Sequence, residues 1–144
     1  MNAPRAAVAG LIATAVMTAL LLVEPSVGLP KIAIGQILSS SLGLASAHLA
    51  SGPVLGWIIH FAIGILLALL YAAVFDRWLR GGPLGRGLTY GGLVFVVAQV
   101  LFMPLVGGGF FSRGDGQLLA GSLIGHLVYG GLTGWIYGRP ARAV

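Results

Sequence analysis

Residues 54–75 have the sequence VLGWIIHFAIGILLALLYAAVF, and this stretch decides the fold class of the chain. It contains no Asp, Glu, Lys or Arg. An α-helix rises about 1.5 Å per residue, so about 20 apolar residues cross the roughly 30 Å hydrocarbon core of a bilayer. Because lipid offers no hydrogen bonds, a single span must satisfy its own backbone as a helix. The stretch therefore predicts a membrane-spanning α-helix.

Three further stretches share this lack of charged residues, at 6–23, 87–106 and 118–137. The first is longer than the apolar region of a secretory signal peptide, and no A-x-A cleavage site follows it. We therefore expect it to span the membrane as well. Together the four stretches predict an all-α integral membrane four-helix bundle, with residues 1–144 as a single membrane domain.

The composition agrees with a membrane protein. Hydrophobic residues make up 58% of the chain and charged residues 8%, whereas a soluble domain carries about 25% charged residues. The net charge of +5 comes from basic residues between the apolar stretches, where anionic lipid headgroups attract them. We therefore expect membrane lipids, and no nucleic acid, as partners. The chain has no cysteine, which excludes disulfides and thiolate metal sites.

The basic residues are distributed unequally between the two sides of the predicted bundle. Lys31 and Arg113 fall on one side. The arginines on the other side are Arg5, Arg77, Arg80, Arg86, Arg139 and Arg142. The positive-inside rule then places both termini in the cytoplasm.

The first outer segment, residues 24–53, is long enough to hold further structure. Ile34, Ile37, Leu38 and Leu44 recur there at roughly helical spacing. A one-sided apolar pattern of this kind is typical of a helix that lies in the membrane interface. We predict a short interfacial helix in this segment.

The second and fourth stretches repeat one pattern, H-x3-G-x3-small-x2-Y. Its residues are His60, Gly64, Ala68 and Tyr71 in the second stretch, and His126, Gly130, Gly134 and Tyr137 in the fourth. The first and third stretches both end in a proline that Val-Gly follows two residues later, at Pro25 and Pro104. The pattern predicts two helical hairpins as a parallel repeat about an axis along the membrane normal. His60 and His126 would then lie at similar depth in the outer leaflet.

Small and polar residues share the helix faces that carry the two histidines. The predicted helix-packing positions are Gly56, Gly64, Ala68, Ser122, Gly130 and Gly134. Small residues let membrane helices approach closely, and histidines between them can then form interhelical hydrogen bonds. In the first interpretation, therefore, His60 and His126 serve helix association.

Two other interpretations of the histidines stay open. Ionisable residues inside a membrane are functional candidates, and two imidazoles at one depth are suitable axial ligands for a b-type haem or a related pigment. The other is a proton relay, with Gln99, Thr133, Tyr71 and Tyr137 as polar steps, although each tyrosine lies about 16 Å along the helix from its histidine. The chain has no G-x-S-x-G, no H-E-x-x-H and no paired intramembrane carboxylates, so we predict no catalytic residue and no metal site.

Three motifs support a family resemblance: W-x2-H-x3-G-x3-A-x2-Y at 57–71, P-L-x-G-G-G-F-F at 104–111 and G-H-L-x-Y-G-x3-G at 125–134. With them the chain resembles uncharacterised small four-span bacterial inner-membrane proteins, the YagU-like proteins and their relatives. The resemblance implies a helical protein of the bacterial inner membrane and transfers no active site.

The function expected from these features is that of a non-catalytic membrane protein. We predict a small accessory or structural subunit of a larger inner-membrane complex, respiratory or photosynthetic, that packs against other membrane subunits or itself. One alternative is a haem- or pigment-binding protein that uses His60 and His126. Another is a small transporter or channel that acts as an oligomer.

Overall fold

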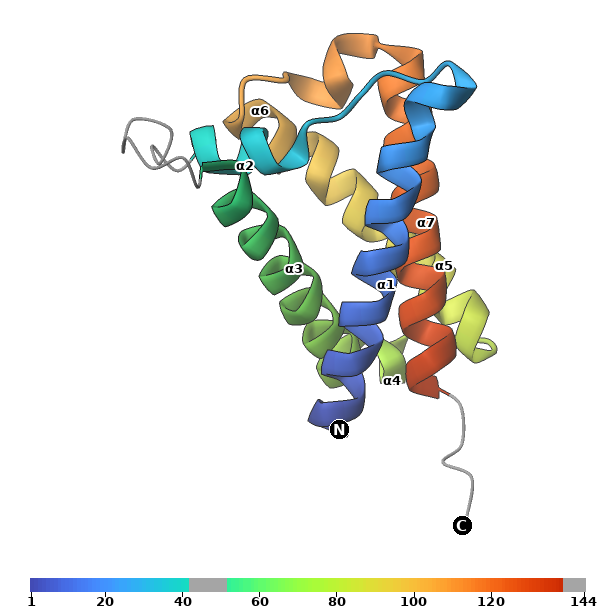
Figure 1. Cartoon of the computed structure of the whole chain (residues 1–144). Helices are drawn as coiled ribbons and strands as arrows, with labels where there is room; N and C mark the ends of the chain where they lie inside the picture. Colours follow the sequence, from blue (N-terminus) through green and yellow to red (C-terminus); the bar gives the residue numbers. More distant parts are fainter. Residues whose placement is uncertain (42–51, 139–144) are drawn as a thin grey trace.

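The computed structural model describes residues 1–41 and 52–138, and over these residues the chain is helical with no strand (Figure 1). Four helices are long: α1 (Ala3–Val23), α3 (Gly52–Leu70), α5 (Pro83–Val97) and α7 (Gly116–Gly138). Leu44, Arg139 and Arg142 lie outside the described residues. The all-α prediction is confirmed for the described part of the chain.

Shorter elements extend or connect the long helices. The π-helical turns η2 (Tyr71–Phe75) and η3 (Ala98–Phe102) continue α3 and α5, and α4 (Asp76–Trp78) and α6 (Met103–Leu105) follow them. The 3-10 helix η1 (Glu24–Val27) ends α1, and η4 (Phe110–Gly114) precedes α7. The helix α2 (Ile34–Ser41) lies in the segment where an interfacial helix is predicted.

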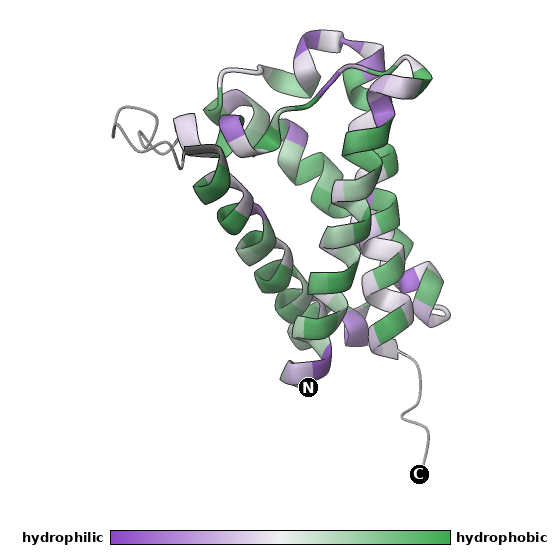
Figure 2. Cartoon of the chain, in the orientation of Figure 1, coloured by the Kyte–Doolittle hydropathy of each residue, from purple (hydrophilic) through white to green (hydrophobic). Residues whose placement is uncertain are grey.

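Three of these continuous helices are long and apolar enough to cross a membrane: Ala3–Val27, Val54–Trp78 and Pro83–Leu105. The helix α7 is also long and has no charged residue, but its many glycines and its histidine and tyrosines lower its hydropathy. Figure 2 shows the apolar residues along the helices and the polar residues mainly at their ends. The structure therefore supports a membrane protein with three apolar helices and a further, glycine-rich one.

The long helices pack around α1 and α7. α1 lies against both α3 and α7, α7 lies against α5, and α2 crosses the end of α3 (Figure 1). Asn2 caps the start of α1, because its side-chain oxygen accepts a hydrogen bond of 3.1 Å from the Arg5 backbone N–H and so satisfies one free donor of the first turn.

A cluster of buried aromatic rings fills the half of the bundle nearest the N-terminus. The Tyr71 ring lies 5.1 Å from Tyr90 and 6.1 Å from Tyr137, measured between centroids. The hydroxyl of Tyr90 donates to the Leu67 carbonyl at 2.7 Å, and that of Tyr129 to the Gly64 carbonyl at 2.6 Å. These bonds join α5 and α7 to α3 and satisfy hydroxyls that would be costly to bury alone.

Candidate functional site

Small residues bring the helices of each hairpin into backbone contact. Between α1 and α3, Gly10 lies against Ala68, and Gly64 lies against Thr14. A Cβ atom placed on Gly10 would be 2.6 Å from the Ala68 Cβ, which is too close for any real side chain. The contact leaves no free space beside Gly64, since the Thr14 side chain occupies it.

The helices α5 and α7 cross in the same way. Gly87 lies against the backbone of Gly130 and Gly134, and Gly91 lies against the backbone of His126 and Gly130. All four glycines are buried, because backbone meets backbone at this crossing. Gly130 and Gly134, two of the predicted packing positions, therefore lie at the α5–α7 crossing, where the two helix backbones are in contact.

The remaining predicted packing positions have different surroundings. Gly56 lies against the backbone of Gly35, so it seats α2 on α3. Ser122 takes part in a hydrogen-bond network, because its hydroxyl accepts from the Gln99 Nε2 at 3.0 Å. Gly56, Gly130 and Gly134 therefore meet the backbone of another helix, Gly64 and Ala68 pack against Thr14 and Gly10 of α1, and Ser122 makes a polar contact.

The network around His126 connects three elements. His126 Nδ1 lies 2.7 Å from the Ser122 carbonyl oxygen and 3.4 Å from its hydroxyl. Gln99 joins this pair to Ser112, whose hydroxyl donates to Gln99 Oε1 at 2.9 Å. The Phe95 ring packs edge-on against the imidazole, with 6.0 Å between centroids. His126 is therefore held by Ser122 one helix turn away and by the Phe95 ring, and Gln99 in turn binds Ser122.

Two unusual backbone features place the members of this network. Gln99, only 1% exposed, lies in the π-helical turn η3, whose wider turn changes the face to which its side chain points. Phe111, Ser112 and Arg113 all have positive φ, from 45° to 54°, which is uncommon for residues with a side chain. Sequence reasoning missed Ser112, since the glycine-rich segment around it indicates only a turn.

His60 has different surroundings. Its ring contacts those of Trp57 and Phe61, at 5.8 and 5.9 Å between centroids. Its Nε2 is buried and has no hydrogen-bond partner among the described residues. Thr18 follows Thr14 by one helix turn on α1, as His60 precedes Gly64 by one turn on α3, and the Thr18 hydroxyl is likewise buried without a partner in the described chain.

The two predicted histidines lie on different helices, His60 on α3 and His126 on α7. Tyr71 and Tyr137 lie in the aromatic cluster at the other end of the bundle, and within residues 1–41 and 52–138 no hydrogen bond joins them to the histidines. The tyrosines of the expected relay are therefore separate from the histidines.

Glu24 is a further buried polar residue, at the outer end of α1. Its side chain is 6% exposed, and both carboxylate oxygens face Gly121 of α7 with no partner among the described residues. Sequence reasoning did not single it out as a site residue. The available signal was a lone carboxylate at the end of an apolar stretch, directly before Pro25.

A b-type haem needs two axial ligands and room for its ring. Each histidine has an imidazole nitrogen that can still bind iron. The room is missing, because helix contacts already fill the sides of Gly56, Gly64 and Gly130, the glycines one turn from the histidines. Among the described residues, no three His, Asp or Glu side chains are grouped so that they could hold a metal ion.

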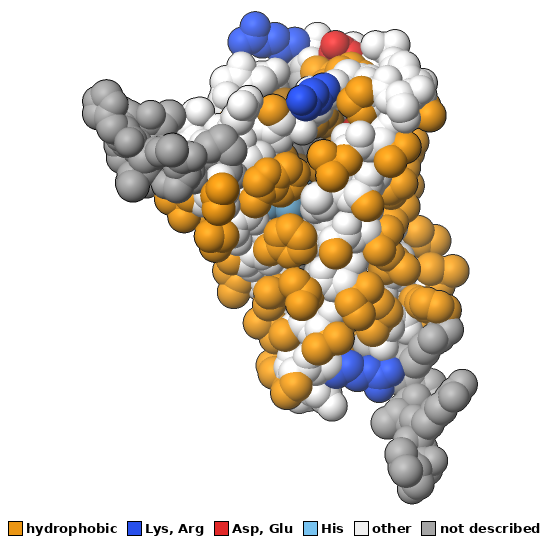
Figure 3. Space-filling view, viewed as in Figure 1, with side chains coloured by type: hydrophobic (Ala, Val, Ile, Leu, Met, Phe, Trp, Pro, Cys, Tyr) orange, Lys and Arg blue, Asp and Glu red, His pale blue; other side chains and the backbone are white. Residues whose placement is uncertain are grey.

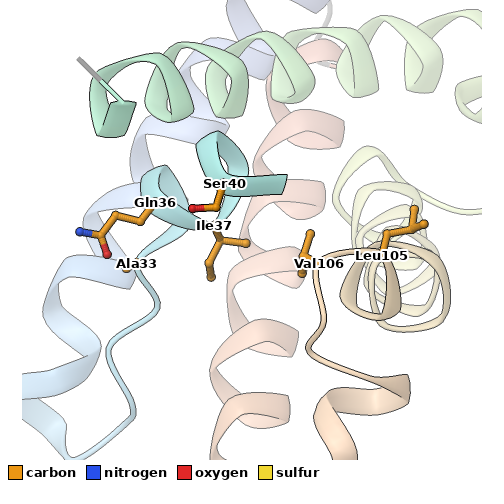
Figure 4. A pocket seen from close by; sticks show the side chains of 6 residues that line it. All are labelled: Ala33, Gln36, Ile37, Ser40, Leu105 and Val106. Carbon is orange, nitrogen blue, oxygen red and sulfur yellow. The ribbon is translucent and has the colours of Figure 1, made fainter. Parts of the chain in front are cut away.

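Two pockets lie beside α2, at the end of the bundle away from the N-terminus. The larger, of about 380 Å³, lies between α2 and the end of α6 (Figure 4). Gln36, Ile37 and Ser40 line it from α2, with Leu105 and Val106 opposite them. The second, of about 260 Å³, lies between the end of α1 and Trp57 of α3. Neither pocket is lined by a histidine.

Charged groups lie at the two ends of the bundle, with apolar side chains between them (Figure 3). At the end that holds the N-terminus, Arg86 forms an ion pair of 2.9 Å with Asp76, and Arg5 donates to the Ile136 carbonyl at 2.8 Å. At the other end, Arg113 donates to the Gly107 carbonyl at 3.0 Å.

Comparison with known proteins gives a family and no function. The model of a family of unknown function, DUF6789, matches residues 1–143. No curated protein and no solved structure matches the chain. The resemblance to YagU-like proteins is not shown by this match and stays a prediction.

Proposed function

The chain belongs to the DUF6789 family, whose function is unknown, and we propose that it is a non-catalytic structural or accessory subunit of a larger bacterial inner-membrane complex. In this proposal all four long helices cross the membrane. The assembly that it joins is a respiratory or photosynthetic one, and the two hairpins form the unit that packs against neighbouring subunits.

The observation that carries the proposal is the match between the two helix crossings. Gly10 and Thr14 meet Ala68 and Gly64 in the first hairpin, as Gly87 and Gly91 meet Gly134 and Gly130 in the second. In both, contacts recur every four residues along antiparallel helices. This supports a parallel repeat of two hairpins, with α7 as the counterpart of α3 and hence a span itself.

The use of the polar side chains supports a structural role. Ser112, Gln99, Ser122 and His126 bind one another and tie η3 and η4 to α7. Interhelical hydrogen bonds of this kind hold membrane helices together. In the proposal, therefore, the histidines stabilise the bundle, and the apolar outer surface meets lipid and neighbouring subunits.

The orientation in the proposal places both termini in the cytoplasm. Support comes from Arg5, Arg77, Arg80 and Arg86, which lie at the end of the bundle that also holds the N-terminus. Lys31 and Arg113 are the basic residues toward the other end.

Native purification tests the proposed role. The chain, tagged at its chromosomal locus, is extracted from inner membranes in a mild detergent, and its mass is measured together with its partners. We expect a complex of fixed composition that contains other proteins besides this 14.7 kDa chain. A homogeneous particle that contains only this chain would contradict the subunit role and favour the transporter or channel alternative.

The haem alternative has its own test, because the unpartnered Nε2 of His60 is the specific observation in its favour. A visible spectrum of the purified protein from haem-replete cells is recorded oxidised and then reduced. From the filled space beside Gly64 and Gly130 we expect no haem band. A band that shifts on reduction and disappears in both His60→Ala and His126→Ala would establish ligation instead.

A further inference from the structure

We propose that the pocket beside Trp57 binds an anionic phospholipid of the outer leaflet, with Lys31 at the lipid phosphate and the end of α1 along the upper part of an acyl chain. This inference does not depend on the subunit role, because it concerns one exposed pocket and its own charge. Lipid binding at this site applies equally to a free-standing protein.

The walls of the pocket are mainly apolar. The pocket, of about 260 Å³, takes Leu21 and Leu22 from α1, Pro25 from η1 and Trp57 from α3. Its other side comes from Lys31, Ile32 and Ala33, which lead into α2, and from Gly35 and Gln36 in the first turn of α2. A groove with hydrocarbon walls and one ammonium group matches a molecule with an apolar chain and an anionic head.

The charge of Lys31 is not neutralised within the described chain. Lys31 is exposed and makes no ion pair or hydrogen bond with any described residue. Glu24 is seven residues away in the sequence, but its carboxylate faces Gly121 on α7 and does not line the pocket. Asp115 caps α7, because its side chain accepts from the Gln117 and Leu118 N–H groups. An external anion is therefore the available partner for Lys31.

The position of the pocket along the bundle selects a lipid as the source of that anion. Trp57 lies near the outer end of α3, and tryptophan is enriched where headgroups meet hydrocarbon. Leu22, beside the pocket, is 67% exposed, so the apolar wall continues onto the surface that faces hydrocarbon. A lysine near an anionic membrane surface contributes about 1 kcal/mol, which corresponds to roughly a fivefold preference.

Quenching of Trp57 fluorescence by brominated lipids tests the proposal. Trp78→Phe and Trp135→Phe leave Trp57 as the single tryptophan, and the protein is reconstituted in phosphatidylcholine vesicles. Brominated phosphatidylglycerol or brominated phosphatidylcholine is then added at equal mole fraction. We expect phosphatidylglycerol to reach Trp57 with about fivefold higher apparent affinity. The preference should disappear in Lys31→Gln and persist in Arg113→Gln, which removes the other outer basic residue.

Two outcomes would overturn the proposal. One is equal quenching by both lipids in the protein that retains Lys31, and the other is a preference that survives Lys31→Gln. A third measurement separates lipid from free anion: inorganic phosphate outside the vesicles should leave the quenching unchanged, and competition by phosphate would show an anion site without lipid selectivity. The helical circular dichroism of each variant shows that it is folded.

Discussion

The two hairpins hold equivalent histidines in different ways. In the α5–α7 hairpin, His126 bonds its own turn and touches Phe95, and Gln99 connects its neighbour Ser122 to Ser112. In the α1–α3 hairpin, His60 and Thr18 have buried polar atoms without partners in the described chain. The comparison teaches that the sequence pattern shared by α3 and α7 accompanies similar helix contacts, while residues outside the pattern decide whether the histidine is satisfied.

The largest effect should come from filling a glycine at a backbone crossing. Gly91→Leu would drive its side chain into the His126 carbonyl and Leu127, and backbone cannot move aside cheaply. We expect a loss of more than about 4 kcal/mol of unfolding free energy, or no folded protein. Gly92→Leu is the matched control, because nothing lies within 4 Å of that position and the change should be within about 0.5 kcal/mol. Thermal unfolding in detergent measures both.

If Gly91→Leu and Gly92→Leu proved equally stable, α5 and α7 would not cross as described. The same experiment distinguishes the hairpins. Gly64→Ala meets the side chain of Thr14 and not backbone, so Thr14→Ala should restore part of its stability. No single partner substitution should rescue Gly91→Ala.

The next effect concerns the polar network of the second hairpin. Gln99→Leu removes the partner of Ser112 and Ser122 together and leaves both hydroxyls inside the bundle. We expect a destabilisation of about 1–2 kcal/mol, in line with interhelical hydrogen bonds in membranes. Steric trapping or denaturant titration in detergent measures the change in unfolding free energy. Wild-type stability in this variant would show that the network contributes nothing to the fold.

The smallest effect contrasts the two histidines directly. His60→Phe replaces an unpartnered ring by an apolar one and should leave stability unchanged or raise it by up to about 1 kcal/mol. His126→Phe loses a hydrogen bond to the Ser122 carbonyl and should cost about 1 kcal/mol. Unfolding of the two variants under one condition gives the difference. A greater loss for His60→Phe would reverse the comparison and show that His60 has a partner that the described chain does not supply.

Much of the fold follows from the sequence, because a span without charge has few alternatives in lipid. The four charge-free stretches lie within or close to α1, α3 with η2, α5 to α6, and α7. Ile34, Ile37 and Leu38, whose spacing predicts a short helix, lie in α2. α1 and α5 begin a few residues before the predicted limits, because Arg5 and Arg86 interrupt the charge-free stretches but not the helices.

The site was only partly predictable, for reasons that are local. The pattern shared by His60 and His126 identifies one helix of each crossing, but Gly10, Gly87 and Gly91 on the partner helices belong to no visible motif. The inward position of Gln99 depends on a π-helical turn, which shifts the helix face and breaks the 100° periodicity. Ser112 enters the network through a left-handed backbone turn, which side-chain periodicity cannot signal.

Disulfide cross-linking tests the central claim, the shared register of the two hairpins, most directly. The chain has no cysteine, so pairs can be introduced without a background: Thr18→Cys with His60→Cys, and Phe95→Cys with His126→Cys. Under mild oxidation in membranes, we predict that both pairs form disulfides, and that pairs displaced by one turn, Thr18→Cys with Gly56→Cys and Phe95→Cys with Ser122→Cys, do not. Cross-linking of only one hairpin, or of the displaced pairs in preference, would contradict the account.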